Sequence, residues 1–160
     1  VTTRAVAEAA RVPVGSVYRY FANADDLLSA LFDRMNAGTV GLLRDTLARA
    51  PESWRDRVDR TFAHLGEMHA GHPAYGALQV HLDGGEGDAE IARLLEDLVR
   101  RDAPRLDSDL IQEVVRTVMA ILDGVERRLH RLDEDRRPGA LEQARLAVTA
   151  YLAHHLDRTE

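Results

Sequence analysis

TTRAVAEAARVPVGSVYRYF, residues 2–21, predicts two short helices separated by a tight turn. Apolar residues recur at helical spacing over 3–11, which gives the first helix a face that can be buried. Pro13 has no backbone N–H and therefore ends that helix, and Gly15 gives the turn conformational freedom. The second helix, over 16–20, would present two tyrosines and one arginine. A helix, a short turn and a second exposed helix are typical of a helix-turn-helix DNA-binding motif.

The residues expected to contact DNA lie on the second helix and at the two helix starts. Arg19 is the one long basic side chain on the second helix, and it can make a bidentate contact to guanine. Tyrosine hydroxyls and the backbone N–H groups at a helix start can bind phosphates. Alternatively, Tyr18 is a core aromatic and Arg19 a solvated charge. The expected contact residues are Thr2, Thr3, Arg4, Val14, Gly15, Ser16, Tyr18, Arg19 and Tyr20.

The same stretch resembles the TetR-type one-component transcriptional regulators. Arg11 departs from the family pattern, which usually has Gly there, and Ala24 stands where a phosphate-contacting Lys is usual. In the family a further helix precedes this motif, so we expect the first helix to be truncated or unresolved here. The matching residues are Val6-Ala7, Ala10-Arg11-Val12, Gly15-Ser16-Val17-Tyr18, Tyr20-Phe21 and Asp25-Asp26-Leu27-Leu28.

The resemblance implies an all-α protein with a helix-turn-helix region, incomplete at its N-terminus, over 1–28. An effector-binding and dimerisation domain would follow over 29–160. The implied function is a ligand-responsive repressor that binds a palindromic operator as a homodimer and is released by a small-molecule effector. The implied partners are double-stranded operator DNA, the effector and a second copy of the chain.

The charge distribution agrees with this interpretation. The whole chain has a formal net charge of −6, but residues 1–24 contain three arginines against one glutamate, which leaves −8 on the rest. A basic segment on an acidic protein is typical of a local nucleic-acid contact rather than of general coating. With 45% hydrophobic residues, no cysteine and no long apolar run, the composition predicts a globular cytoplasmic protein without a membrane partner.

The apolar spacing predicts helices throughout the remaining chain. Asn23 is a good N-cap for a helix over 24–50, and Ser53 for one over 54–70. Further helices are expected over 73–82 and from Asp88 to the residues before Pro104. The side chains expected to line an effector pocket, each of which could equally be ordinary core, are Trp54, Phe62, Leu65, Met68, Tyr75, Leu78 and Met119.

A seven-residue apolar repeat between 111 and 132, followed by a similar helix over 141–155, favours a helical hairpin. Two such hairpins could form a four-helix bundle between two copies of the chain. Alternatively, the same rows pack inside one protomer. The residues expected at a dimer interface are Ile111, Val115, Val118, Leu122, Val125, Leu129, Val148, Tyr151, Leu152 and His155.

Two other classes of protein compete with a regulator. One is a helical-bundle enzyme, but the sequence shows no nucleophile elbow, phosphate loop or paired ExxH motif, so no catalytic residue and no cofactor are expected. The other is a helical scaffold that does not bind DNA. Four histidines, His64, His69, His72 and His81, lie close in sequence, but their spacing does not match a metal site and no bound metal is expected.

Overall fold

The computed structural model describes residues 2–49, 52–71 and 86–157, and every regular element within them is a helix. The all-α prediction is therefore confirmed. Tyr75 and Leu78 of the expected pocket, and the helix expected over 73–82, lie outside the described residues. The elements in chain order are α1 (Thr3–Ala10), α2 (Val14–Tyr18), α3 (Ala24–Ala48), α4 (Trp54–Gly71), α6 (Glu86–Asp102), α7 (Ser108–Leu129), the short 3₁₀ helix η1 (Glu134–Arg136) and α8 (Arg137–Leu156).

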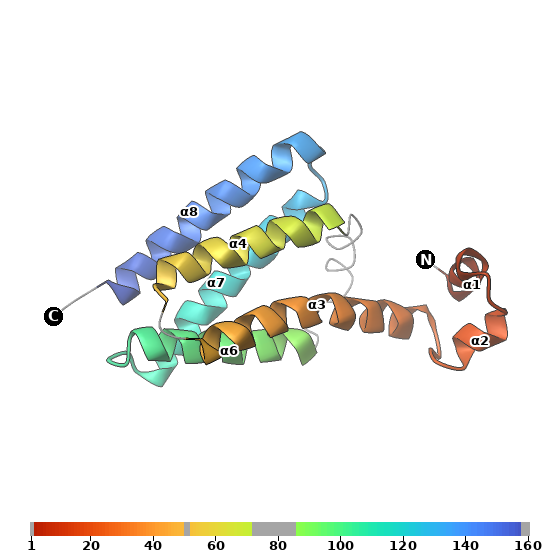
Figure 1. The fold of residues 1–160 in the computed structure, drawn as a ribbon, viewed down its shortest axis with the longest axis horizontal. Helices are drawn as coiled ribbons and strands as arrows, with labels where there is room; N and C mark the ends of the chain where they lie inside the picture. The colour runs from red at the N-terminus through yellow and green to blue at the C-terminus, as the bar shows by residue number, and fades with distance from the viewer. Residues whose placement is uncertain (1, 50–51, 72–85, 158–160) are drawn as a thin grey trace.

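One long helix, α3, connects two parts of the molecule. Figure 1 shows α1 and α2 at one end, beyond the start of α3, and the other helices along its C-terminal half. We call α1, the turn and α2 (residues 2–22) the head. We call the C-terminal half of α3 with α4, α6, α7 and α8 the body. In the body α3 packs against α6, α6 against α7, and α8 against both α4 and α7.

The helix starts expected at Asn23 and Ser53 are confirmed. The N–H of Asp26 donates to Asn23 Oδ1 at 2.9 Å, and the N–H of Asp56 donates to Ser53 Oγ at 3.1 Å. The helix expected to begin at Asp88 instead begins at Glu86, so Asp88 lies within its first turn. Helix α6 therefore includes Glu86, two residues before the expected start.

The seven-residue repeat of α7 faces the core of its own protomer. Ile111 is only 1% exposed, and the same cluster includes Phe32 of α3 and Phe62 of α4. Burying the strongest apolar stripe of a helix removes the most apolar area from water. This stripe of α7 therefore packs into the core of its own protomer. Residues that are buried in this core have no surface left for a partner, and the interface prediction is corrected for them. These residues are Ile111, Val115, Val118, Leu129, Val148 and Leu152.

This core assignment predicts a large and specific loss of stability. Ile111→Ala should lower the free energy of unfolding by about 2–5 kcal/mol, because it leaves a cavity among fully buried neighbours. The adjacent Leu110→Ala is the matched control, since Leu110 is 36% exposed and should cost well under half as much. Urea unfolding of both variants measures the difference, and equal losses would contradict the assignment.

Candidate nucleic-acid interface and ligand pocket

The head is a pair of short helices held by local capping and a small core. The N–H of Ala5 donates to Thr2 Oγ1 at 3.2 Å, which makes Thr2 the N-cap of α1. Ala7 of α1 and Val17 of α2 are buried where the two helices pack together. This arrangement leaves the outer side of α2 exposed. The predicted helix-turn-helix layout is confirmed.

The turn between α1 and α2 depends on the conformation of Arg11, not on Gly15 as predicted. Arg11 follows α1 with φ 55°, the left-handed conformation, and the N–H of Val12 donates to the carbonyl of Ala7 at 3.0 Å. Both features are those of a Schellman-type helix end, whose left-handed residue is usually Gly. Gly15 has no turn role, because α2 begins at Val14 and Gly15 lies within it. The conformational demand therefore falls on Arg11, at the position where the sequence departs from the family pattern.

A non-glycine residue in the left-handed region costs roughly 1 kcal/mol or more. Arg11→Gly should therefore stabilise the head by about 1 kcal/mol, seen as slower hydrogen exchange of the α1 and α2 amides. Arg11→Ala is the control, because it removes the same charge but keeps the Cβ that causes the strain. Equal exchange rates in the two variants would contradict this explanation.

The exposed side of α2 carries the chemistry expected of a DNA contact. A Cβ built on Gly15 would meet no heavy atom within 4 Å, so the backbone there is open to close approach. Ser16 is exposed, and Tyr20 is 73% exposed just beyond the helix. The guanidinium of Arg19 lies 5.7 Å from the centroid of the Tyr20 ring, a cation–π contact that orients both side chains.

Thr3 and Tyr18 form one unit rather than two separate contacts. Thr3 is 6% exposed, and its Oγ1 donates to the Tyr18 hydroxyl at 2.9 Å. The prediction that Thr3 contacts DNA is corrected, because its side chain lies beneath Tyr18 and orients it. Tyr18 is exposed, so the core alternative does not hold, and its own hydroxyl proton can still be donated to a phosphate. Thr2, Arg4 and Val14 of the expected contact set are exposed.

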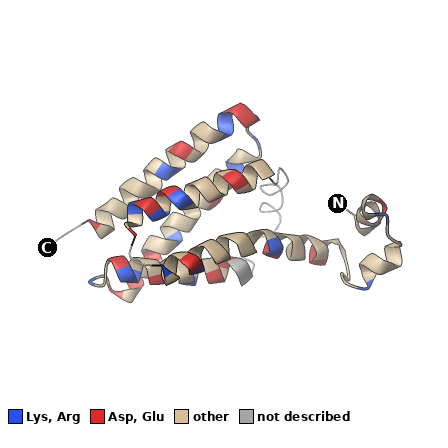
Figure 2. Cartoon of the chain, in the orientation of Figure 1, with Lys and Arg blue, Asp and Glu red and all other residues tan. Residues whose placement is uncertain are grey.

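The head is joined to α3 by a reciprocal cap. Besides the bond from the N–H of Asp26 to Asn23, the N–H of Ala22 donates to Asp26 Oδ2 at 3.1 Å. These two bonds fix the direction in which the chain leaves the head. Figure 2 shows acidic and basic residues mixed along the body helices, whereas α2 carries no acidic residue.

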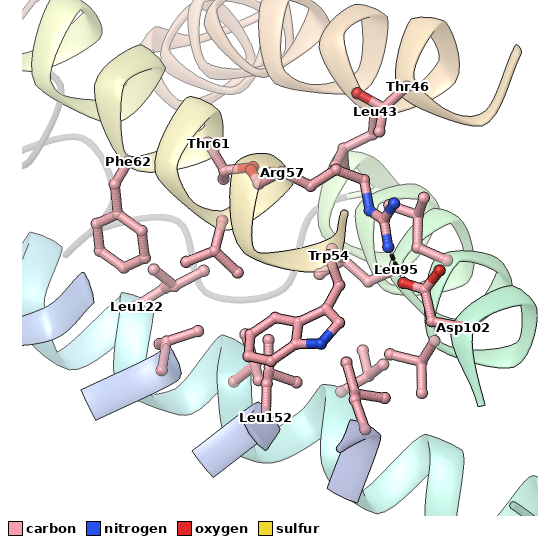
Figure 3. A pocket seen from close by; sticks show the side chains of 17 residues that line it. Leu43, Thr46, Trp54, Arg57, Thr61, Phe62, Leu95, Asp102, Leu122 and Leu152 are labelled. Atoms are coloured by element: carbon pink, nitrogen blue, oxygen red, sulfur yellow. Dashed lines mark hydrogen bonds and ion pairs between the residues drawn. The ribbon is translucent and has the colours of Figure 1, made fainter. Parts of the chain in front are cut away.

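A cavity of about 90 Å³ lies inside the body (Figure 3). Trp54 and Phe62, two of the residues expected at an effector pocket, line it. Most of the remaining wall is apolar and comes from five helices, α3, α4, α6, α7 and α8. The residues that sequence reasoning missed at this cavity are Leu43, Thr46, Arg57, Val58, Thr61, Leu95, Leu98, Val99, Asp102, Val115, Val118, Leu122, Val148, Leu152 and Leu156.

The polar side of this cavity is an ion pair between Arg57 of α4 and Asp102 of α6 (Figure 3). Arg57 is buried and also donates to the carbonyl of Glu52. Burial lowers the pKa of Arg57 from its ordinary value, and the nearby positive charge of Arg101 acts in the same direction. Because each charge faces its opposite, the pair presents no net charge to the cavity.

A second cavity, of about 70 Å³, lies next to the first. Leu65 and Met119 line it, whereas Met68 is buried in the core and lines neither cavity. Its other lining residues, none of them predicted, are Asn36, Thr39, Leu43, Thr61, Asp88, Ile91, Leu95, Leu122, Asp123 and Glu126.

Other kinds of site find little support in the described part of the chain. Within residues 2–49, 52–71 and 86–157, no group of three His, Asp or Glu side chains is arranged to hold a metal ion. His64 Nε2 instead lies 3.4 Å from Thr39 Oγ1, while His72 and His81 lie outside the described residues. No helix in the same ranges is long and apolar enough to cross a membrane.

An exposed short helix, packed on a preceding helix through a tight turn, is the layout of a helix-turn-helix motif. Residues 1–31 match the family "Bacterial regulatory proteins, tetR family". A TetR-family transcriptional regulator from Streptomyces coelicolor is similar in structure, with a TM-score of 0.74, 26% identity, and coverage of 98% of this chain and 88% of that chain. A possible TetR family transcriptional regulator from Streptomyces coelicolor A3(2) has a TM-score of 0.64, 19% identity, and coverage of 97% and 83%.

A comparison with curated protein sequences found no match. The head is therefore similar to the TetR-family DNA-binding region over residues 1–31, and the fold is similar over nearly the whole chain to that of a TetR-family transcriptional regulator. Members of this family are transcription factors rather than enzymes.

Proposed function

We propose that this protein is a ligand-responsive repressor that binds a palindromic operator as a homodimer and releases it when a small molecule occupies the body. The observation that carries the proposal is the exposed surface formed by Gly15 and Ser16 of α2 and by Arg19 and Tyr20, which directly follow it. We assign DNA reading to residues 1–28, and effector binding and dimerisation to 29–160, with α3 crossing the boundary.

In the proposed complex α2 enters the major groove. Arg19 binds a guanine edge, and the hydroxyls of Tyr18 and Tyr20 bind phosphates on either side. The open backbone at Gly15 and the N–H groups at the start of α2 allow a phosphate to come close to the helix. Arg4 and Thr2, exposed at the start of α1, can reach the flanking backbone.

The proposed dimer uses the surface of α7 and α8 that the protomer core leaves uncovered. Three of the predicted interface residues, Val125, Tyr151 and His155, are half-buried rather than buried in this core, whereas Leu122 lines both cavities. Leu146 of α8 is 47% exposed, and the exposed small residues Ala147 and Ala150 follow it on the same helix and permit close helix approach. Joining two copies here would place two α2 helices about 34–36 Å apart, one turn of DNA.

Release of DNA requires a connection between the cavities and the head, and α3 supplies it. Its C-terminal end is held to the body, where Arg60 Nη2 donates to Thr46 Oγ1 at 3.0 Å and Arg101 Nη1 to the carbonyl of Leu47 at 3.3 Å. Leu43, which lines both cavities, and Thr46, which lines the first, belong to the same segment. A ligand that fills the cavities would tilt α3 about this end and change the spacing of the two heads.

The DNA-contact assignment predicts that Arg19→Ala and Tyr20→Ala each weaken operator binding by about tenfold or more, through loss of a base contact or a phosphate contact. The operator is first selected from random duplexes by the wild-type protein, and affinity is then measured by fluorescence anisotropy at fixed salt.

Arg100→Ala is the matched control for Arg19→Ala, because Arg100 is an exposed arginine on α6, outside the proposed dimer surface, and its removal changes the net charge equally. Its affinity should stay within about twofold of wild type. If both head variants also bind with wild-type affinity, the proposed contact surface is refuted.

A further inference from the structure

The start of α2 offers a base pair no hydrogen-bonding side chain. Pro13, which precedes the helix, makes no side-chain cap bond, and Val14 and Gly15 follow it. None of these three residues carries a polar side-chain atom. Ser16 is therefore the first residue of α2 that has a hydroxyl to offer. Any side-chain contact made before Ser16 is apolar.

Val14 is exposed, whereas the other valine of the same helix is buried. Val17, one turn further along α2, packs in the small core of the head and is 7% exposed, but Val14 is 40% exposed. Next to Val14, a Cβ built on Gly15 would meet no heavy atom within 4 Å. A flat group can therefore approach the Val14 side chain without meeting a side chain at position 15.

The surroundings of Val14 are those of a nucleic-acid contact. Helix α2 contains no acidic residue, and the exposed Arg19 and Tyr20 directly follow it. Isolated apolar residues are common on protein surfaces and need no special explanation. Val14, however, lies on the surface proposed to enter the major groove, where the apolar group on a base edge is the C5 methyl of thymine.

We propose that Val14 recognises one thymine in each half-site of the operator, through contact between its methyl groups and the C5 methyl of that base. This inference rests on the proposed function, because it requires α2 to lie in the major groove. In a helix-turn-helix complex the first residues of the second helix are those that contact base edges. Arg19 then specifies guanine through hydrogen bonds, and Val14 specifies thymine by removing apolar surface from water.

Deoxyuridine differs from thymidine only in lacking the C5 methyl, so the unaltered protein can be tested. The operator is selected from random duplexes by the wild-type protein, and its thymines are then replaced one position at a time in one half-site. At one position the replacement should weaken binding by about fourfold, the effect of one buried methyl group, as measured by fluorescence anisotropy at fixed salt. A selected operator without a sensitive thymine would overturn the proposal.

Val14→Ala removes the two methyl groups proposed to contact thymine. In this variant the same deoxyuridine replacement should change affinity by less than about 1.5-fold, because the two changes remove one interaction. Leu31→Ala is the matched control and should keep the fourfold sensitivity, because Leu31 is 41% exposed and lies on α3, outside the head. A thermal melt verifies folding. Full sensitivity in folded Val14→Ala would overturn the assignment, because another group would then contact the methyl.

A modified cytosine separates contact with the methyl group from hydrogen bonding to the base. Cytosine and 5-methylcytosine form the same hydrogen bonds and differ only by a methyl group at C5. When either replaces thymine at the sensitive position, 5-methylcytosine should bind wild type about fourfold more tightly than cytosine. Equal affinities would overturn the proposal, and this comparison requires no protein variant.

These measurements separate failure of this inference from failure of the proposed function. If the selection enriches no duplex, the protein does not recognise DNA, and both fail. If a duplex is enriched and bound but deoxyuridine changes nothing, operator binding stands and only the role of Val14 fails. Sensitivity to the methyl group in wild type, together with its loss in Val14→Ala, supports both.

Discussion

The structure depends on α3 belonging to two parts of the molecule at once. It is buried against the body through Phe32, Val40 and Leu43, and its first turn is capped by Asn23, which directly follows the head. A continuous helix transmits a change of orientation along its length, because its backbone hydrogen bonds resist bending. In the proposed mechanism, packing around the cavities therefore sets the direction in which α2 points.

Local sequence signals were sufficient for most of the fold. The caps at Asn23 and Ser53 involve residues three apart, so the residue type and its spacing predict them directly. The turn of the head could not be predicted in the same way. Gly15 is the residue that most easily adopts positive φ, yet the geometry of the helix end places that conformation at Arg11. The sequence shows which residue adopts positive φ most easily, whereas the packing of the helices decides which residue must adopt it.

The pocket and the interface were less predictable, because they depend on contacts between residues far apart in the chain. The Arg57–Asp102 pair joins two helices, and no local pattern indicates that these charges meet. The apolar repeat of α7 was visible in the sequence, but periodicity does not say whether its partner is in the same chain or in another copy. The burial of Ile111 among residues of α3 and α4 answers that question for the main stripe.

The central claim is that two α2 helices are held one DNA turn apart and that the body controls their spacing. Because the chain has no cysteine, Ala9→Cys, at an exposed position on α1, gives a single spin label per protomer. Pulsed electron paramagnetic resonance on the operator complex should give one narrow interprotomer distance distribution, set by head centres about 34–36 Å apart. The distribution should shift when effector releases the DNA. No dipolar coupling between labels, or the same distribution with and without DNA and effector, would contradict the account.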